Sequence, residues 1–135
     1  MKFATLLGAA SLASLASLAA AQDADLLVLD YPGFEDPMFH QPYVEKYGQS
    51  PTFSFFGDEE EAFQKVRSGF RADVAHICAG SVPKWQESGL IEPWDTSRLT
   101  YFADLNASLL GTEVAAEGDL YFLPTDFGTT AIAYN

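Results

Sequence analysis

A strand, a helix and a second strand follow one another in residues 52–77, which read TFSFFGDEEEAFQKVRSGFRADVAHI. Thr52–Phe56 consists largely of β-prone Thr and Phe side chains. The acidic run Asp58–Glu61 suits a helix start, because its first carboxylate can accept a hydrogen bond from a free backbone N–H group. Apolar side chains then recur at helical spacing in residues 62–70, and Asp73–Ile77 returns to a β-prone pattern. This alternation predicts an α/β fold.

Elements on both sides of this unit extend the alternation. Leu26–Leu29 is a continuous apolar run, typical of a parallel strand that is buried on both faces. Asp30–Gly33 ends it with Pro and Gly. The further expected elements are helices over Pro37–Tyr47 and Pro83–Ser88, an extended segment over Leu90–Asp95, and strands over Leu120–Leu123 and Ala131–Tyr134. The sequence therefore predicts an α/β domain with a mostly parallel sheet.

The N-terminal residues have the three parts of a cleavable secretory signal. Lys2 supplies positive charge, Phe3–Ala20 is uncharged and rich in Leu and Ala, and Ala19–Ala21 offers small residues for cleavage. A membrane-spanning helix is the alternative, but the Ser residues in this stretch dilute its hydrophobicity. We expect cleavage after Ala21, which leaves residues 22–135 as a chain the size of one domain.

The charge of the chain argues against nucleic acid as a partner. The sequence has 19 acidic residues against 7 basic ones, for a net charge of -12. A surface that follows a phosphate backbone needs clustered Lys and Arg side chains. The negative charge is compatible with a cationic ligand, and equally with a surface that is charged for solubility.

Few residues in the sequence suit catalysis or metal binding. Cys78 is the single cysteine, so no internal disulfide can form, and a thiol in an apolar stretch is most often a small buried core residue. His76 and Cys78 could share a metal only with further ligands, and His40 is the one other histidine. The sequence contains no G-x-S-x-G motif and no phosphate-binding glycine pattern. We therefore predict no catalytic residue, no metal and no cofactor.

Aromatic and acidic side chains gather in the predicted loops after the strands. In parallel α/β sheets, ligands bind beyond the carboxyl ends of the strands, which here singles out residues 30–34, 78–81 and 126–129. An aromatic face together with a carboxylate suits an organic cation, although the aromatic rings could equally serve packing. The candidate ligand-binding residues are Asp30, Tyr31, Phe34, Cys78, Ser81, Asp126 and Phe127.

Three blocks of the sequence match motifs of one known family. They are ADVA, VPKW and GLIEPWD within residues 72–95, a stretch of the form L-x-x-F-x-x-L at Leu99–Leu105, and YFLP followed by GTTAI within residues 121–132. With these motifs the chain resembles the periplasmic solute-binding proteins of bacterial ABC importers, and most closely their spermidine/putrescine-binding group. The resemblance covers residues 25–135.

The resemblance implies two α/β lobes joined by a hinge, with a small ligand held between them. It also implies a monomeric periplasmic protein, without a cofactor, that delivers a polyamine to a membrane permease. Residues 22–135 would supply most of the first lobe, so the sheet would be incomplete and the second lobe missing. Tyr31 and Phe34 would supply aromatic faces, Asp126 a carboxylate and Ser81 a hydrogen bond.

The chain departs from the polyamine-binding group at three places. After the first strand that group has an aromatic residue, Thr, Glu and Tyr, whereas residues 31–34 read YPGF here. Residues 78–81 read CAGS and lack the aromatic residue of that group, and DFG at residues 126–128 is more similar to thiamine-binding relatives. Thus a binding protein for thiamine, a metal ion or a sugar is one alternative, and an exported enzyme on an α/β scaffold is another.

Overall fold

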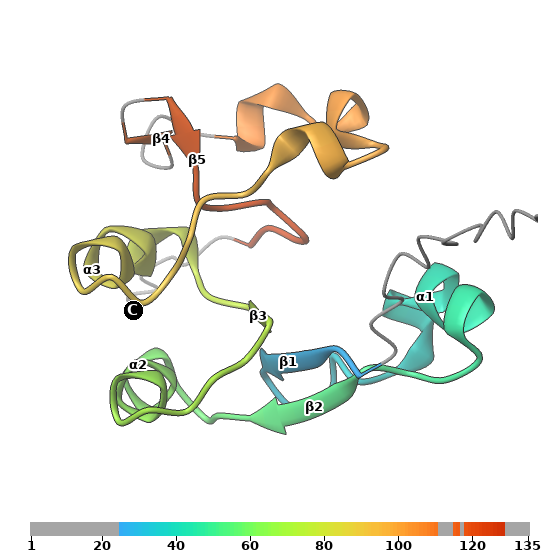
Figure 1. Cartoon of the computed structure of the whole chain (residues 1–135), viewed down its shortest axis with the longest axis horizontal. Helices are drawn as coiled ribbons and strands as arrows, with labels where there is room; N and C mark the ends of the chain where they lie inside the picture. Colours follow the sequence, from blue (N-terminus) through green and yellow to red (C-terminus); the bar gives the residue numbers. More distant parts are fainter. Residues whose placement is uncertain (1–24, 111–114, 117, 129–135) are drawn as a thin grey trace, which may run out of the picture.

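The computed structural model describes residues 25–110, 115–116 and 118–128, in which short strands and helices alternate (Figure 1). The elements in chain order are β1 (Leu27–Asp30), η1 (Pro37–Phe39), α1 (Gln41–Tyr47), β2 (Thr52–Phe55), α2 (Glu59–Arg67), β3 (Val74–Ala75), η2 (Ala79–Ser81), α3 (Val82–Glu87), η3 (Thr96–Arg98), η4 (Phe102–Asp104), η5 (Ala107–Leu109), β4 (Ala115–Ala116) and β5 (Asp119–Leu120). Among the described residues, no helix has the length and apolar character that crossing a membrane requires. The expected signal at residues 1–21 and the expected strand at residues 131–134 lie outside the described residues.

The central sheet has three parallel strands in the order β2-β1-β3. The apolar strand β1 lies in the middle, pairs with β2 along Leu27–Asp30, and pairs with β3 at Val28 and Leu29. The backbone N–H of His76 also donates to the carbonyl oxygen of Leu29 at 2.8 Å, so the pairing continues beyond the end of β3. The predicted α/β fold with a parallel sheet is confirmed.

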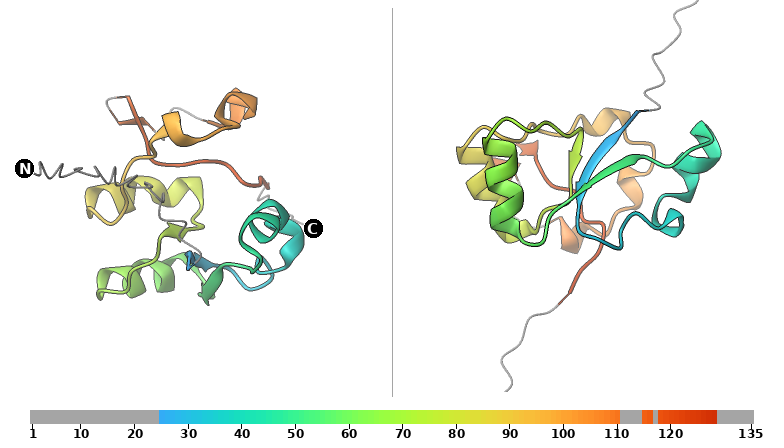
Figure 2. Two further views of the ribbon diagram at one scale, coloured as in Figure 1. Left: turned by 45° about the vertical axis from the view of Figure 1, so that its right-hand side comes forward. Right: turned by 90° about the horizontal axis from the view of Figure 1, so that it is seen from below.

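The helix α2 begins and packs as the sequence pattern predicts. The carboxylate of Asp58 accepts a hydrogen bond from the backbone N–H of Glu61 at 2.8 Å and caps the helix. Ala62, Phe63 and Val66 on its inner face are buried. They form the core with buried side chains of β1, α3 and the segments that follow β2 and β3: Leu29, Phe56, Ile77, Val82 and Trp85. Figure 2 shows α2 and α3 on one side of the strands and α1 on the other.

The single helix expected over Pro37–Tyr47 is two shorter elements, η1 and α1. His40 separates them, with a φ of -138° that is not helical. Pro42 explains the break, because proline has no N–H group to donate to the preceding turn and is accommodated only in the first turn of a helix. The helix α1 begins at Gln41, which places Pro42 in that first turn.

Two strands are also shorter than the sequence predicts. The strand β3 covers two of the residues expected in Asp73–Ile77. The strand expected over Leu120–Leu123 is the short β5, which pairs antiparallel with β4 through a turn that contains Gly118 at a φ of 97°.

Cys78 is exposed, so the prediction of a buried core thiol is wrong. Cys78 lies in the loop between β3 and η2, where the chain has left the sheet.

Candidate functional site

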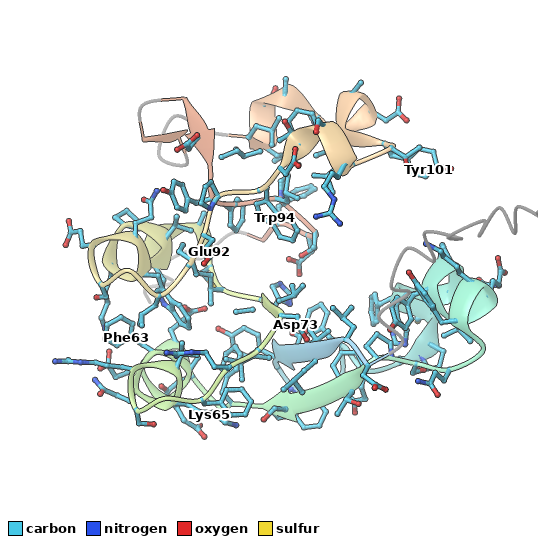
Figure 3. All side chains as sticks on the ribbon, in the orientation of Figure 1. Phe63, Lys65, Asp73, Glu92, Trp94 and Tyr101 are labelled. Atoms are coloured by element: carbon cyan, nitrogen blue, oxygen red, sulfur yellow. The ribbon has the colours of Figure 1, made fainter. Side chains whose placement is uncertain are left out.

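An open cavity of about 1270 Å³ lies beside the sheet. Its wall includes Asp30 at the end of β1, His76 just after β3, and Asp126 in the segment that follows β5. Figure 3 shows Trp94 and Asp73, which also line the cavity, on opposite sides of this space. Ligand pockets for small molecules commonly measure roughly 300–1,000 Å³. The cavity exceeds this range, since it is open and its wall runs along one face of the sheet from Leu26 to Asp30. The carboxyl ends of β1 and β3 form one part of the wall of a space that can admit a small organic ligand.

The imidazole of His76 joins two carboxylates from different segments of the chain. Its Nδ1 lies 2.7 Å from Oδ1 of Asp30, a residue that is 6% exposed. Its Nε2 lies 3.5 Å from Oδ1 of Asp126 and 3.3 Å from Oγ1 of Thr125. The hydrogen bond to Asp30 raises the pKa of His76 against the opposing effect of burial, and the charges of both carboxylates add to the increase. The cluster ties β1, β3 and the segment after β5 together.

A second cluster forms around the carboxylate of Glu59, the first residue of α2. Its Oε1 accepts hydrogen bonds from the Tyr31 hydroxyl at 2.7 Å and from the backbone N–H of Cys78 at 2.8 Å. Burial opposes the negative charge, but these hydrogen bonds, together with one from Ser81, lower the pKa of Glu59. Tyr31 also packs on Phe56, with ring centroids 4.3 Å apart. Glu59 thus connects α2 with the loops that follow β1 and β3.

The same carboxylate suppresses the ionisation of its neighbours. Burial, followed by the hydrogen bond and negative charge of Glu59, raises the pKa of Tyr31 and that of Cys78. The reactive form of cysteine is the thiolate, and a raised pKa keeps Cys78 in the unreactive thiol form near neutral pH. This arrangement is unsuited to a nucleophilic cysteine.

The structure divides the seven predicted site residues into three sets. One set lines the cavity and consists of Asp30, Phe34 and Asp126. Another gathers around the carboxylate of Glu59 and consists of Tyr31, Cys78 and Ser81. Phe127 stands apart from both sets, with 82% of its surface exposed.

Two residues at the centres of these clusters were not predicted as part of the site. From the sequence, His76 is a possible metal ligand and Glu59 is part of an acidic helix start. Among the residues that the structure describes, no group of three or more His, Cys, Asp or Glu side chains is arranged so that it could hold a metal ion. A search for polar side chains immediately after each strand would have included His76. No comparable signal marks Glu59, because its partners come from loops far away in the sequence.

Replacing Glu59 with glutamine is expected to lower the free energy of unfolding by about 1–2 kcal/mol, because the amide loses the charge that strengthens both hydrogen bonds. Partial exposure to solvent keeps the effect in this low range. Since the pKa of folded Glu59 is lowered from 4.5, its contribution is present above that value and is lost as the pH falls through the folded-state pKa. Urea unfolding at neutral and acidic pH measures both effects.

The neighbouring substitution Glu60→Gln is the matched control. Glu60 pairs with Lys84 on the surface, where ion pairs contribute little to stability. We expect this variant to unfold close to the wild-type midpoint. Equal losses at the two positions would contradict the structural role of Glu59.

Comparison with known proteins finds similarity to a binding protein. No family model matches the sequence. The similar protein belongs to the class of polyamine-binding proteins. It is the putrescine/agmatine-binding protein of Pseudomonas aeruginosa, to which this chain is 28% identical over 127 residues. The similarity covers 91% of this chain and 34% of that protein, so the chain spans about a third of the relative's length.

Proposed function

We propose that this chain is part of a periplasmic solute-binding protein of an ABC import system, and that its ligand is a polyamine. The observation that carries the proposal is the set of Asp30, Phe34 and Asp126, which lines an open cavity that runs along the sheet and includes the carboxyl ends of β1 and β3. Carboxylates and an aromatic ring are the groups that recognise an organic ammonium. The similarity to a protein named for putrescine and agmatine supports the same class of ligand.

The candidate residues take different parts in this proposal. The side chain of Asp126 is 62% exposed and is available to a ligand in the cavity. Phe34 offers a ring on the same wall. Asp30 is buried and already bonded to His76 and to the backbone N–H of Tyr31, so its part is to position the imidazole. The set around Glu59 holds the loops in place.

The proposal for the whole protein follows the family resemblance. A signal at residues 1–21 would direct export to the periplasm, and residues 22–135 would form part of the first lobe. A second lobe would close over the cavity and hold the ligand, and the monomeric protein would pass it to a membrane permease. A wide cavity along the sheet suits a lobe that binds its ligand by closing against another one.

Polyamines are expected to raise the midpoint of thermal unfolding of the natural full-length protein. A ligand that binds the native state alone, at 100 times its Kd, adds about 2.7 kcal/mol of stability. We would compare putrescine, agmatine and spermidine with thiamine and glucose at equal ionic strength. Butane-1,4-diol is the matched control, because it has the length of putrescine without the charges.

The outcomes separate the alternatives. A rise with polyamines and none with the diol supports the proposed ligand. A rise with thiamine or glucose alone would keep a solute-binding function but discard the polyamine. No rise with any of these compounds would contradict the proposal and direct attention to an exported enzyme.

A further inference from the structure

The two nitrogens of the His76 imidazole have different partners and therefore different roles. Nδ1 faces the carboxylate of Asp30 at 2.7 Å. Carboxylate oxygens accept hydrogen bonds, so Nδ1 carries a hydrogen in both the neutral and the charged ring. The backbone N–H of Tyr31, at 2.7 Å from the same carboxylate oxygen, helps to fix Asp30. The proton that His76 gains and loses is therefore the one on Nε2.

Nε2 faces the open side of the cluster. The carboxylate of Asp126 lies 3.5 Å away and the hydroxyl of Thr125 lies 3.3 Å away. In the charged ring, the N–H at this position attracts the carboxylate of Asp126. In the neutral ring, Nε2 carries a lone pair instead of a hydrogen. Nε2 and the carboxylate of Asp126 are then two neighbouring hydrogen-bond acceptors in the cavity wall. The 62% exposure of the Asp126 side chain keeps that point within reach of a ligand.

We propose that Nε2 of His76 and the carboxylate of Asp126 together bind one ammonium group of the ligand, which takes the place of the Nε2 proton. An ammonium nitrogen at about 2.8–3.0 Å from each acceptor makes two normal hydrogen bonds. The 3.5 Å between the two acceptors leaves room for this triangle. Binding releases one proton from His76 to the buffer and exchanges one positive charge for another. This inference rests on cation capture as the proposed function.

The other titratable groups near the imidazole do not compete for this role. The charges that face it directly are those of Asp30 on β1 and Asp126 after β5. Further away, α2 and the loops after β1 and β3 contribute Glu59, Tyr31 and Cys78. The pKa of Glu59 is lowered, and those of Tyr31 and Cys78 are raised. These three groups therefore keep their charge state in the range of about pH 5–8 in which histidine titrates.

The sign of the expected pH dependence follows from the partners of His76. The hydrogen bond to Asp30 raises the pKa of the folded imidazole above 6.5. Without ligand, the stability from this ion pair is present below that ordinary value and is lost as the pH rises through the raised pKa. The affinity for the ligand changes with pH in the opposite direction. With one proton released per ligand, affinity rises about tenfold per pH unit below the His76 pKa and levels off above it.

Calorimetric titration of the full-length protein with putrescine, from about pH 5.5 to 8.5, tests the exchange. Alkyl ammonium groups have a pKa near 10.4 in the case of Lys, so the ligand keeps its charge throughout. Buffers with different ionisation enthalpies reveal the number of protons released. We expect close to one proton at the acidic end, none at the alkaline end, and an affinity that rises as the pH increases.

Two histidine variants make the test specific. His76→Asn keeps an amide donor toward Asp30 but cannot titrate, so the affinity of this variant should lose its dependence on pH. His40→Asn changes the other histidine of the sequence, which lines the same cavity but contacts Ser50, and should keep the full dependence on pH.

The outcomes distinguish the inference from the proposed function. Putrescine binding that is equally tight across the range, or a slope that persists in His76→Asn, overturns the exchange and leaves polyamine capture intact. No putrescine binding at any pH overturns both. If His76→Asn does not fold, NMR titration of wild-type His76 still decides. Its pKa must be lower with putrescine than without, and an unchanged or higher pKa overturns the exchange.

Discussion

Trp85→Ala is expected to lower the free energy of unfolding by about 3–5 kcal/mol. The Trp85 side chain on α3 is 1% exposed and meets the ring of Phe63 edge-on, with centroids 5.8 Å apart. Its removal leaves a cavity between α2 and α3 that the surrounding side chains fill only in part. Domains of this kind commonly have about 5–15 kcal/mol of total stability, so the variant should unfold at much lower urea concentrations.

Two further variants isolate the reason for this loss. Trp94→Ala removes the same atoms from a side chain that is 37% exposed, and should cost about 1 kcal/mol. Trp85→Phe keeps an aromatic ring in the core and removes the buried Nε1–H, which has no hydrogen-bond partner in the described part of the chain. It should cost much less than Trp85→Ala. Similar losses for Trp85→Ala and Trp94→Ala would contradict the assignment of Trp85 to the core.

The elements that sequence reasoning predicts correctly are those with strong local signals. The helix α2 combines a capping carboxylate at Asp58 with apolar residues at helical spacing, and both features appear in the structure. The continuous apolar run predicts a strand of a parallel sheet that is buried on both faces, and β1 is the middle strand of that sheet. Leu29 is buried in the core as expected, but Val28 on the other face is half-buried and lines the cavity.

The break at His40 follows from Pro42, a local signal that the expected helix over Pro37–Tyr47 did not take into account. The short β3 is harder to predict, because its length depends on pairing with β1.

The sequence predicts which loops hold the candidate site residues but not which of those residues contact one another. The rule that ligands bind at the carboxyl ends of parallel strands singles out the loop that holds Asp30. It does not account for Asp126, because the strand before Asp126 is β5, which pairs antiparallel with β4 outside the parallel sheet. The contact of His76 with Asp30 depends on the register between β1 and β3. Because Leu29 pairs with Ala75, the residues that follow them, Asp30 and His76, lie next to each other. Periodicity within one strand indicates which residues share a face, but it does not identify which residue of the neighbouring strand lies opposite each of them. The contact with Asp126 likewise depends on the tertiary path of the chain after β5.

Asp126→Asn is expected to weaken the affinity of the full-length protein for putrescine by about 1.5–3 kcal/mol, or roughly 10–150-fold, since hydrogen bonds to charged groups contribute this much. The amide keeps the shape of the side chain and one acceptor oxygen, but it loses the charge that attracts the ammonium group. The substitution also removes one of the carboxylates that raise the pKa of His76. The pH profile of any remaining affinity should therefore move to lower pH.

The control for this prediction is Asp119→Asn, which removes the same charge from an exposed residue of β5 that is not part of the cavity lining. Affinity close to that of the wild type is expected, because salt screens an exposed charge that does not touch the ligand. Both variants should keep the wild-type unfolding midpoint without ligand, given that the Asp126 side chain is 62% exposed. Equal weakening by the two substitutions would mean that putrescine responds to overall negative charge rather than to one carboxylate. Wild-type affinity in Asp126→Asn would remove Asp126 from the site, and with it the paired acceptors that make His76 part of ligand binding.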